Sequence, residues 1–170
     1  MKKLFATLIL AAMILSTGCG NKSENPAPPA EQKPTVSTPA PSANSSAEKF
    51  SIGGISPGMS LDEAKKIFGE PTSTHDDEFT FANGLRVETE GVLNGTIESI
   101  EIRQGNVPTG AGVAIGMSEQ DLANAYGKPD STENDDGKIE HKYFSSDRRI
   151  KLEFDVAGGV ITEIKCSLVD

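Results

Sequence analysis

Cysteine is scarce in this sequence, and its scarcity argues against a fold that depends on disulfide bonds. The 170 residues include only two cysteines, Cys19 and Cys166. Cys19 follows an N-terminal apolar segment, and its modification there would leave Cys166 without a partner within the chain. An exported chain without disulfides must take its stability from a hydrophobic core. We expect Cys166 to be a small buried side chain of that core.

Basic residues are also few relative to acidic ones. The chain has 16 Lys and Arg against 25 Asp and Glu, which gives a formal net charge of −9. Removal of residues 1–18, which contain Lys2 and Lys3 but no acidic residue, would change this charge to −11. Phosphate backbones repel such a chain, so we expect no nucleic-acid partner. Attachment to an anionic membrane would require a lipid anchor.

No apolar run is long enough to span a bilayer. The longest runs from Leu4 to Leu15, whereas a spanning helix needs about 20 residues. It follows two lysines and has the size of a secretory signal peptide's hydrophobic part. The next letters, LSTGC, resemble the bacterial lipobox. This resemblance implies cleavage after Gly18, acylation of Cys19 and an extracytoplasmic, membrane-anchored location. The alternative is an ordinary signal peptide with an incidental cysteine.

The segment that follows Cys19 is rich in proline. Residues 20–48 hold six of the ten prolines and no aromatic residue. Such a segment buries too little apolar surface to offset the entropy of ordering, so we expect a disordered tether. The sequence therefore predicts a signal peptide at 1–18, a lipidated cysteine and tether at 19–48, and a folded region of two repeats at 49–110 and 111–170.

The two repeats are visible as a duplicated phrase. ISPGMSLDEAKKIFGEP at 55–71 recurs as VAIGMSEQDLANAYGKP at 113–129. In each copy a serine is followed three residues later by an acidic residue, which predicts a capping box at a helix N-terminus. A glycine and then a proline end each helix. We expect the helices to pack on a sheet through Ile67, Phe68, Leu122 and Tyr126.

After each helix the apolar period changes to two, which is typical of strands. Asn83-Gly84 between two alternating segments predicts a hairpin, and Asn94-Gly95 predicts a second turn. The other copy has turns at 145–147 and at Gly158-Gly159. Each repeat is thus predicted as αβββ. The expected fold class is α+β: two tandem αβββ units with short helices packed on one face of an antiparallel sheet, and the other face open.

Two phrases carry a family resemblance. GMSxxxLxxxYGKPD at 116–130 and KLEFDVAGGVITEI at 151–164 resemble two related groups, the small outer-membrane lipoprotein of the barrel-assembly machinery and the tandem-repeat β-lactamase inhibitor protein family. The shared residues are mainly those of helix caps and turns. The resemblance therefore implies the fold of the inhibitor-like family, in which two units form one sheet with an open binding face.

No motif for catalysis is present: the sequence has no nucleophile elbow, no phosphate loop and no catalytic carboxylate pair. We expect no enzyme activity, no cofactor and no metal site. The two histidines, His75 and His141, lack partners at motif spacing, and His141 shares the register of Ile139 and Tyr143 at the edge of the core. Acidic segments at 75–78 and 133–136 are expected to be loops after each helix. As an alternative function they could bind Ca²⁺, although their spacing does not match an EF-hand.

The alternation of the strands predicts which side chains face away from the core. In the first repeat these are mostly acidic. In the second repeat they form a basic strip with one aromatic residue, expected to lie beside Ile161 and Glu163; the strip consists of Lys142, Phe144, Arg149, Lys151 and Lys165. Aromatic and arginine side chains are enriched at protein interfaces, and the alternative is an ordinary sheet face of mixed charge. The leading hypothesis is an envelope-anchored lipoprotein that binds an envelope or secreted protein, as an inhibitor or assembly factor. The alternative is a cation- or solute-sensing lipoprotein that uses the acidic loops.

Overall fold

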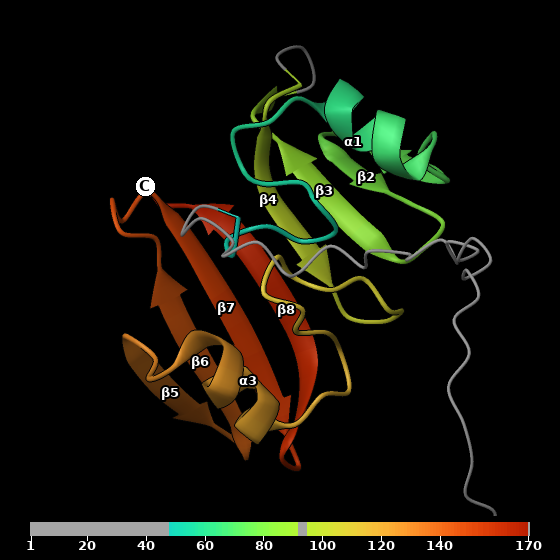
Figure 1. The fold of residues 1–170 in the computed structure, drawn as a ribbon. Coiled ribbons are helices and arrows are strands. Elements are labelled where there is room, and N and C mark those ends of the chain that lie inside the picture. Colours follow the sequence, from blue (N-terminus) through green and yellow to red (C-terminus); the bar gives the residue numbers. More distant parts are fainter. Residues whose placement is uncertain (1–47, 92–94, 170) are drawn as a thin grey trace, which may run out of the picture. The chain divides into compact units, whose positions relative to one another are not determined.

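The computed structural model describes residues 48–91 and 95–169 (Figure 1). The predicted signal peptide, Cys19, the tether up to residue 47 and Asn94 of the second predicted turn lie outside the described residues. In the described part of the first half, helix α1 Leu61–Phe68 is followed by the strands β1 Ser73–His75, β2 Glu78–Thr80, β3 Leu85–Thr89 and β4 Ile97–Ile102. The second half has the same order: α3 Glu119–Tyr126, β5 Ser131–Asp135, β6 Lys138–Phe144, β7 Ile150–Ala157 and β8 Val160–Leu168.

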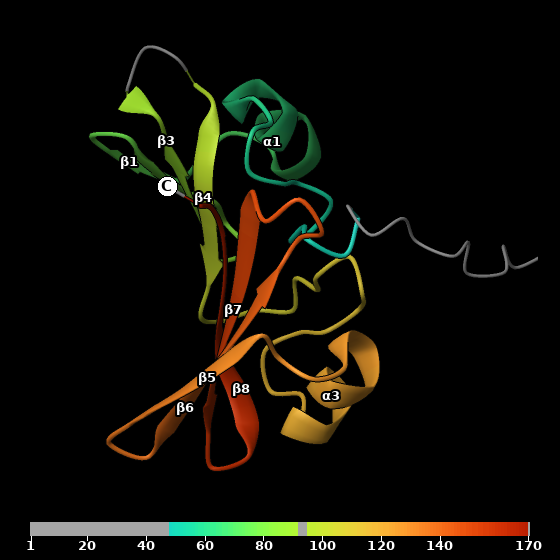
Figure 2. The same cartoon turned by 90° about the vertical axis from the view of Figure 1, so that its left-hand side faces the viewer.

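All eight strands belong to one antiparallel sheet. Its order is β1-β2-β3-β4-β8-β7-β6-β5, so the two halves join through their last strands (Figure 1). At the junction Ile100 of β4 lies opposite Cys166 of β8, and Ile102 lies opposite Ile164. Figure 2 shows α1 beside the strands of the first half and α3 beside those of the second. The duplicated sequence therefore becomes two similar halves of one continuous sheet.

Both helices begin at the predicted capping boxes. The Ser60 hydroxyl accepts a hydrogen bond from the Glu63 amide at 3.3 Å, and the Glu63 carboxylate accepts one from the Ser60 amide at 2.9 Å. Ser118 and Asp121 make the same reciprocal pair. The two helices end at the predicted glycines, Gly69 and Gly127. Neither helix of the described region has the length and apolar character needed to cross a membrane.

The repeated Gly-Met-Ser phrase attaches the chain before each helix to the sheet. The Gly58 amide donates to the Ile97 carbonyl at 2.7 Å, and the Ile97 amide donates to the Met59 carbonyl at 2.8 Å. Gly58 has φ +90°, a conformation that favours glycine. The second copy repeats this pair of bonds from Gly116 and Met117 to Ile161. The phrase is therefore duplicated because the same backbone connection is made twice.

The acidic segments after the helices are strands and tight turns, where we predicted loops. Strands β1 and β2 join at Asp76, and β5 and β6 join at Asp136-Gly137. Both aspartates have positive φ, 51° and 47°, as two-residue hairpins require. The sequence signal was present at Asp136-Gly137. It was missed because β1 and β5 are polar and show no apolar alternation.

The core lies on one face of the sheet, which we call the inner face, and it extends through both halves. Its fully buried large side chains include Phe81 and Leu85 from the first half and Leu152 and Phe154 from the second. Cys166 is also fully buried, as predicted, and burial raises the pKa of its thiol well above the usual range. Loop residues complete this core: Phe50, Ile52, Ile55, Val107 and Val113.

The predicted fold class is wrong in its architecture. The chain is mainly one eight-stranded sheet, with four strands after each helix in place of three. The helices are short and contribute only Leu61, Ala64 and Leu122 to the buried core. Ile67, predicted to pack on the sheet, is 51% exposed. Phe68 and Tyr126 are only partly buried against the core, whereas Leu122, also predicted to pack on the sheet, is 1% exposed.

In the strands of the second half, side chains alternate between the two faces of the sheet as predicted, except at one bulge. Tyr143, Leu152 and Phe154 are buried, and Phe144 and Lys151 lie on the opposite face, as predicted. The register of β7 and β8 shifts between Asp155 and Val156. The bulge inserts Thr162 and reverses the phase of the strand before it. Ile161, predicted to face outward, is therefore buried at 1% exposure.

The first residue of the predicted first repeat, Lys49, is bonded to the second half. The Tyr126 hydroxyl donates to the Lys49 carbonyl at 2.8 Å, and the Lys49 ammonium donates to the Ala125 carbonyl at 3.1 Å. The same ammonium lies 5.9 Å from the centre of the Tyr126 ring. These bonds span more than seventy positions of sequence. They couple the start of the folded region to α3.

We predict that Phe154→Ala destabilises the protein by about 3–5 kcal/mol, because it leaves a cavity in a fully buried site. Ile67→Ala should cost less than about 0.5 kcal/mol, because an exposed side chain loses little contact. Denaturant unfolding of both variants measures the difference. Similar losses for the two variants would contradict the placement of the core.

Candidate interaction face

The sheet face opposite the core carries mainly charged side chains, and we call it the outer face. Cross-strand register arranges these side chains in rows. One row runs from Arg86 on β3 through Glu101, Lys165 and Glu153 to Lys142 on β6. Because residues opposite each other on one face lie within about 5 Å at Cβ, their charges interact. Along this row the signs alternate, and the charged side chains of the face form a lattice that spans the junction of the two halves.

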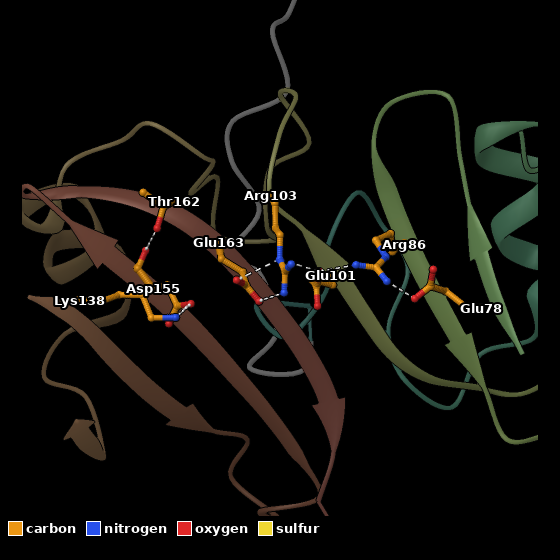
Figure 3. A network of polar contacts seen from close by, with 8 residues as sticks. All are labelled: Glu78, Arg86, Glu101, Arg103, Lys138, Asp155, Thr162 and Glu163. Carbon is orange, nitrogen blue, oxygen red and sulfur yellow. Dashed lines mark hydrogen bonds and ion pairs between the residues drawn. The ribbon is translucent and has the colours of Figure 1, made fainter. Parts of the chain in front are cut away.

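Arginines link the two halves across this face. Arg86 forms ion pairs with Glu78 and, at 3.3 Å, with Glu101 (Figure 3). Arg103 lies 2.9 Å from Glu101 of β4 and 3.1 Å from Glu163 of β8. Burial raises the pKa of Glu163, and the nearby charge of Arg103 opposes this rise. The chain of contacts thus crosses the β4–β8 junction with alternating signs.

A second cluster centres on Lys142. Its ammonium lies 2.8 Å from Glu133, 2.9 Å from Glu140 and 4.0 Å from Glu153. The hydrogen bonds to Glu133 and Glu140 raise the pKa of Lys142, and the hydrogen bond from Lys142 lowers the pKa of Glu133. Only 19% of the lysine side chain is exposed. Lys142 therefore lies between three carboxylates. These carboxylates largely compensate its positive charge, so it would attract an outside partner only weakly.

Lys142 is needed because the second half places acidic residues side by side. Glu133, Glu140, Asp155 and Glu163 lie directly opposite one another in successive strands. Like charges in such positions are destabilising. Lys138, at 2.6 Å from Asp155, offsets a further part of this repulsion (Figure 3). Sequence reasoning missed this row because it depends on the register of four strands.

The turn between β6 and β7 presents an aromatic residue and cations. The guanidinium of Arg148 lies 4.3 Å from the centre of the Phe144 ring, a cation–π distance. Arg148 has φ +57°, and its amide donates to the Ser145 carbonyl at 2.8 Å. Asp147 accepts hydrogen bonds from the Ser145 hydroxyl and the Arg149 amide, which lower the pKa of its carboxyl. The turn is thus held in one shape that places Arg148 over Phe144.

The five residues of the predicted strip differ in their surroundings. Lys142 is neutralised as described, and Lys151 lies 3.0 Å from Glu153. Arg149 is exposed and Lys165 is half-buried, and neither forms an ion pair within 4.0 Å of another described residue. Phe144 is partly exposed on the outer face. The strip is therefore less basic than its sequence implies, and its open part lies at the β6–β7 turn.

A shallow hollow of about 300 Å³ lies beside this turn, and Arg149 lines it. Ile150 and the 36% exposed Leu168 supply apolar walls from the second half. Met59 and Pro57 line it from the chain before α1. An exposed cation therefore stands next to an apolar depression formed by both halves.

The two histidines differ in their exposure and in their neighbours. His141 is 8% exposed, as predicted for the edge of the core, with Nε2 2.8 Å from Glu119 and Nδ1 3.1 Å from the Thr132 hydroxyl. His75 is exposed beside Asp76. Within residues 48–91 and 95–169, no three His, Cys, Asp or Glu side chains are grouped as potential metal ligands.

Comparisons with known proteins identify distant structural neighbours. No protein-family model matches the chain, and no curated protein does. A DUF4309 family protein from Bacillus subtilis is 15% identical, with a TM-score of 0.47 over 67% of this chain and 81% of its own. A Streptococcus mutans protein, provisionally described as a beta-lactamase inhibitor protein, is 18% identical, with a TM-score of 0.26 over 64% of this chain and 82% of its own. An extracellular protein with an SCP domain from Bacillus anthracis is 10% identical, with a TM-score of 0.36 over 65% and 43%.

We predict that Lys142→Met lowers the melting temperature in a pH-dependent way. Lys142 depresses the pKa of Glu133 in the folded state, so this carboxylate contributes stability above its unfolded pKa of about 4.3. That contribution disappears as the pH falls through the folded pKa. The loss caused by Lys142→Met should therefore be greater at pH 7 than in acid, below the lowered folded pKa of Glu133. Thermal melts across this range measure it.

The control is Lys128→Met, which removes the same charge from an exposed lysine outside the row. Its effect on the melting temperature should be small throughout. An effect of Lys142→Met that stays constant from pH 7 to acid would contradict the role assigned to the carboxylate row.

Proposed function

We propose that this chain is a non-enzymatic, protein-binding module whose contact surface is the outer face at the β6–β7 turn. The observation that carries the proposal is the pairing of Phe144 with Arg148 beside Arg149. Aromatic and arginine side chains supply much of the binding energy at protein interfaces. Phe144 is a partly exposed aromatic residue on a face that otherwise presents charged and small polar groups.

The charges of the outer face favour the β6–β7 turn over the middle of the sheet as the contact surface. In the middle of the sheet, Arg86, Glu101 and Lys142 already have partners in the chain. A binding protein would have to desolvate or replace those ion pairs, and the gain would be small. At the turn, Arg148 is 66% exposed and lies 4.0 Å from the Asp130 carboxylate, and Arg149 forms no ion pair with another described residue. An acidic or aromatic group of a partner can approach these cations without breaking the lattice.

The hollow beside Arg149 adds an apolar contact next to the cations. Its walls come from Met59, Ile150 and Leu168. A protein surface that inserts an apolar side chain there and places a carboxylate near Arg149 would use both features. Such a combination of apolar centre and charged rim is typical of protein interfaces. The partner we propose is therefore a folded envelope or secreted protein with an acidic patch around an apolar side chain.

The cellular location that we propose for the module is inferred from the sequence. The apolar run, the LSTGC phrase and the proline-rich segment support an envelope lipoprotein that is anchored through Cys19 and held away from the membrane by residues 20–48. Within that setting the resemblance supports an inhibitor-like or assembly-factor-like role. Such a tether keeps the module near envelope partners and raises their effective concentration.

A photo-crosslinking amino acid at position 144 should capture a specific partner in the envelope of the source cell. The same amino acid at position 80, at the other end of the outer face on β2, is the matched control. Phe144→Ala should then speed dissociation of the captured partner, because it removes apolar contact. Equal crosslinking from positions 144 and 80 would contradict the proposed surface.

Charge reversal separates steering from contact. Arg149→Glu with Lys151→Glu should slow association with the captured partner by about tenfold at low ionic strength and less at high salt. The control pair, Lys66→Glu with Lys128→Glu, changes the net charge equally at exposed sites away from this turn. A control that slows association as much would show that overall charge, and not this turn, guides the partner.

The anchor can be tested separately. Cys19→Ala should release the protein into the medium or leave its precursor uncleaved, because acylation at Cys19 would be lost. Fractionation of cells and medium measures the outcome. Unchanged membrane retention of the variant would contradict lipidation at Cys19.

A further inference from the structure

Strand β5 forms one edge of the sheet, and among residues 48–91 and 95–169 it pairs with β6 alone. Its five residues, Ser131–Asp135, pair with β6 in unbroken register. Alternate backbone N–H and C=O groups of an antiparallel edge strand point away from its neighbour. These groups form a ready template for another strand.

The β5 edge lacks several of the usual features that prevent strand addition. Edge strands are commonly protected by lysine, proline, a bulge or very short length. Strand β5 has no lysine, proline or bulge, and its residues 131–134 are exposed. The opposite edge, β1, has only three residues, whereas β5 has five; a proline stands two residues before each strand, at Pro71 and Pro129. Of the sheet's two edges, β5 is therefore the one able to accept a further strand.

We propose that the β5 edge binds an extended, basic peptide segment of a partner protein as a ninth strand of the sheet. The backbone of β5 would supply the hydrogen bonds, as in other cases of strand addition. The side chain of Glu133 would supply charge selectivity. It lies on the outer face and is 63% exposed although its Oε1 atom contacts Lys142. A lysine or arginine of the added strand, placed opposite Glu133, would add a cation at the end of the row of carboxylates formed by Glu133, Glu140 and Asp155.

The charges favour a basic segment over a second copy of this chain. Glu133, Glu140 and Asp155 form a row of carboxylates that ends at this edge. Two β5 strands paired about a two-fold axis at Glu133 would place two carboxylates directly opposite each other, which is destabilising. The net charge of −9 adds repulsion between copies. The acidic edge thus opposes self-association and still attracts a basic strand.

This binding mode does not rest on the function proposed above. It uses the backbone of β5, whereas the proposed contact surface uses the side chains of the β6–β7 turn. Either can fail without the other.

The test uses the full-length protein and a synthetic seven-residue peptide in which lysine alternates with threonine or valine. Two further peptides carry N-methyl groups on alternate residues, one set on each edge of the extended chain. A strand added to β5 uses one peptide edge only. Methylation of that edge should weaken binding at least about tenfold, because several backbone hydrogen bonds are lost. Methylation of the other edge should leave the affinity within about twofold, because no bond to β5 is lost.

Hydrogen exchange and variants locate the site and its charge preference. Alternate amides of β5 should gain protection when the unmethylated peptide binds. Glu133→Gln should weaken binding of the lysine peptide several-fold, whereas Glu88→Gln, on the outer face of the first half, should not. A peptide with glutamate in place of lysine should bind at least about tenfold more weakly at low salt.

Each of four outcomes would overturn the proposal. Equal affinity of both methylated peptides would show charge attraction without strand addition. Protection at β1 in place of β5 would move the site to the other edge. A dimer in sedimentation that buries the β5 amides would make a second copy of the chain the occupant. No binding of the lysine peptide at millimolar concentration would remove the site altogether.

Discussion

The pairing of β4 with β8 is the interaction on which the rest of the structure depends. It joins the last strands of two similar halves into one sheet. On the inner face the junction brings together fully buried side chains, among them Ile100 opposite Cys166 and Ile102 opposite Ile164. Separated halves would expose these apolar strands as open edges, which are prone to aggregation. Each half is too small to bury a sufficient core alone, so duplication is a structural requirement of this fold.

The same junction shapes the outer face. Because β4 and β8 are neighbours, Glu101 lies opposite Lys165, and Arg103 reaches Glu163. The charges of both halves therefore form one lattice in which most groups already have partners. What the lattice leaves available lies at its borders: the Phe144 and Arg148 pair at the β6–β7 turn, and the backbone of β5 at the sheet edge. The two proposed contact sites of this acidic protein therefore differ in chemistry: one is basic and aromatic, and the other is acidic.

Local signals in the sequence predicted the elements that local geometry determines. The capping boxes at Ser60 and Ser118 and the turns at Gly84 and Gly159 follow from interactions within a few residues. The facing of Phe144 and Lys151 followed from simple alternation. Of the predicted helix contacts, Leu122 is buried and Phe68 and Tyr126 pack partly against the core, whereas Ile67 is 51% exposed.

Features that depend on register or on distant contacts were not predictable in this way. The short polar strands β1 and β5 have no apolar alternation and are stabilised by pairing with their neighbours. The bulge at Asp155 reversed the facing of Ile161. The carboxylate row and its binding by Lys142 require the register of four strands. The neutralisation of the basic strip was hidden for the same reason, since the neighbours of a side chain on a sheet come from other strands.

Native-state hydrogen exchange tests most directly whether the β4–β8 junction makes the two halves one cooperative unit. The hydrogen-bonded amides of β3 and β4 should exchange with the same free energy as those of β7 and β8, equal to the free energy of global unfolding. A value for one half that is lower by about 1.4 kcal/mol or more, a tenfold difference in opening, would show that it unfolds independently. That result would contradict the account of the fold as a single sheet held together at its centre.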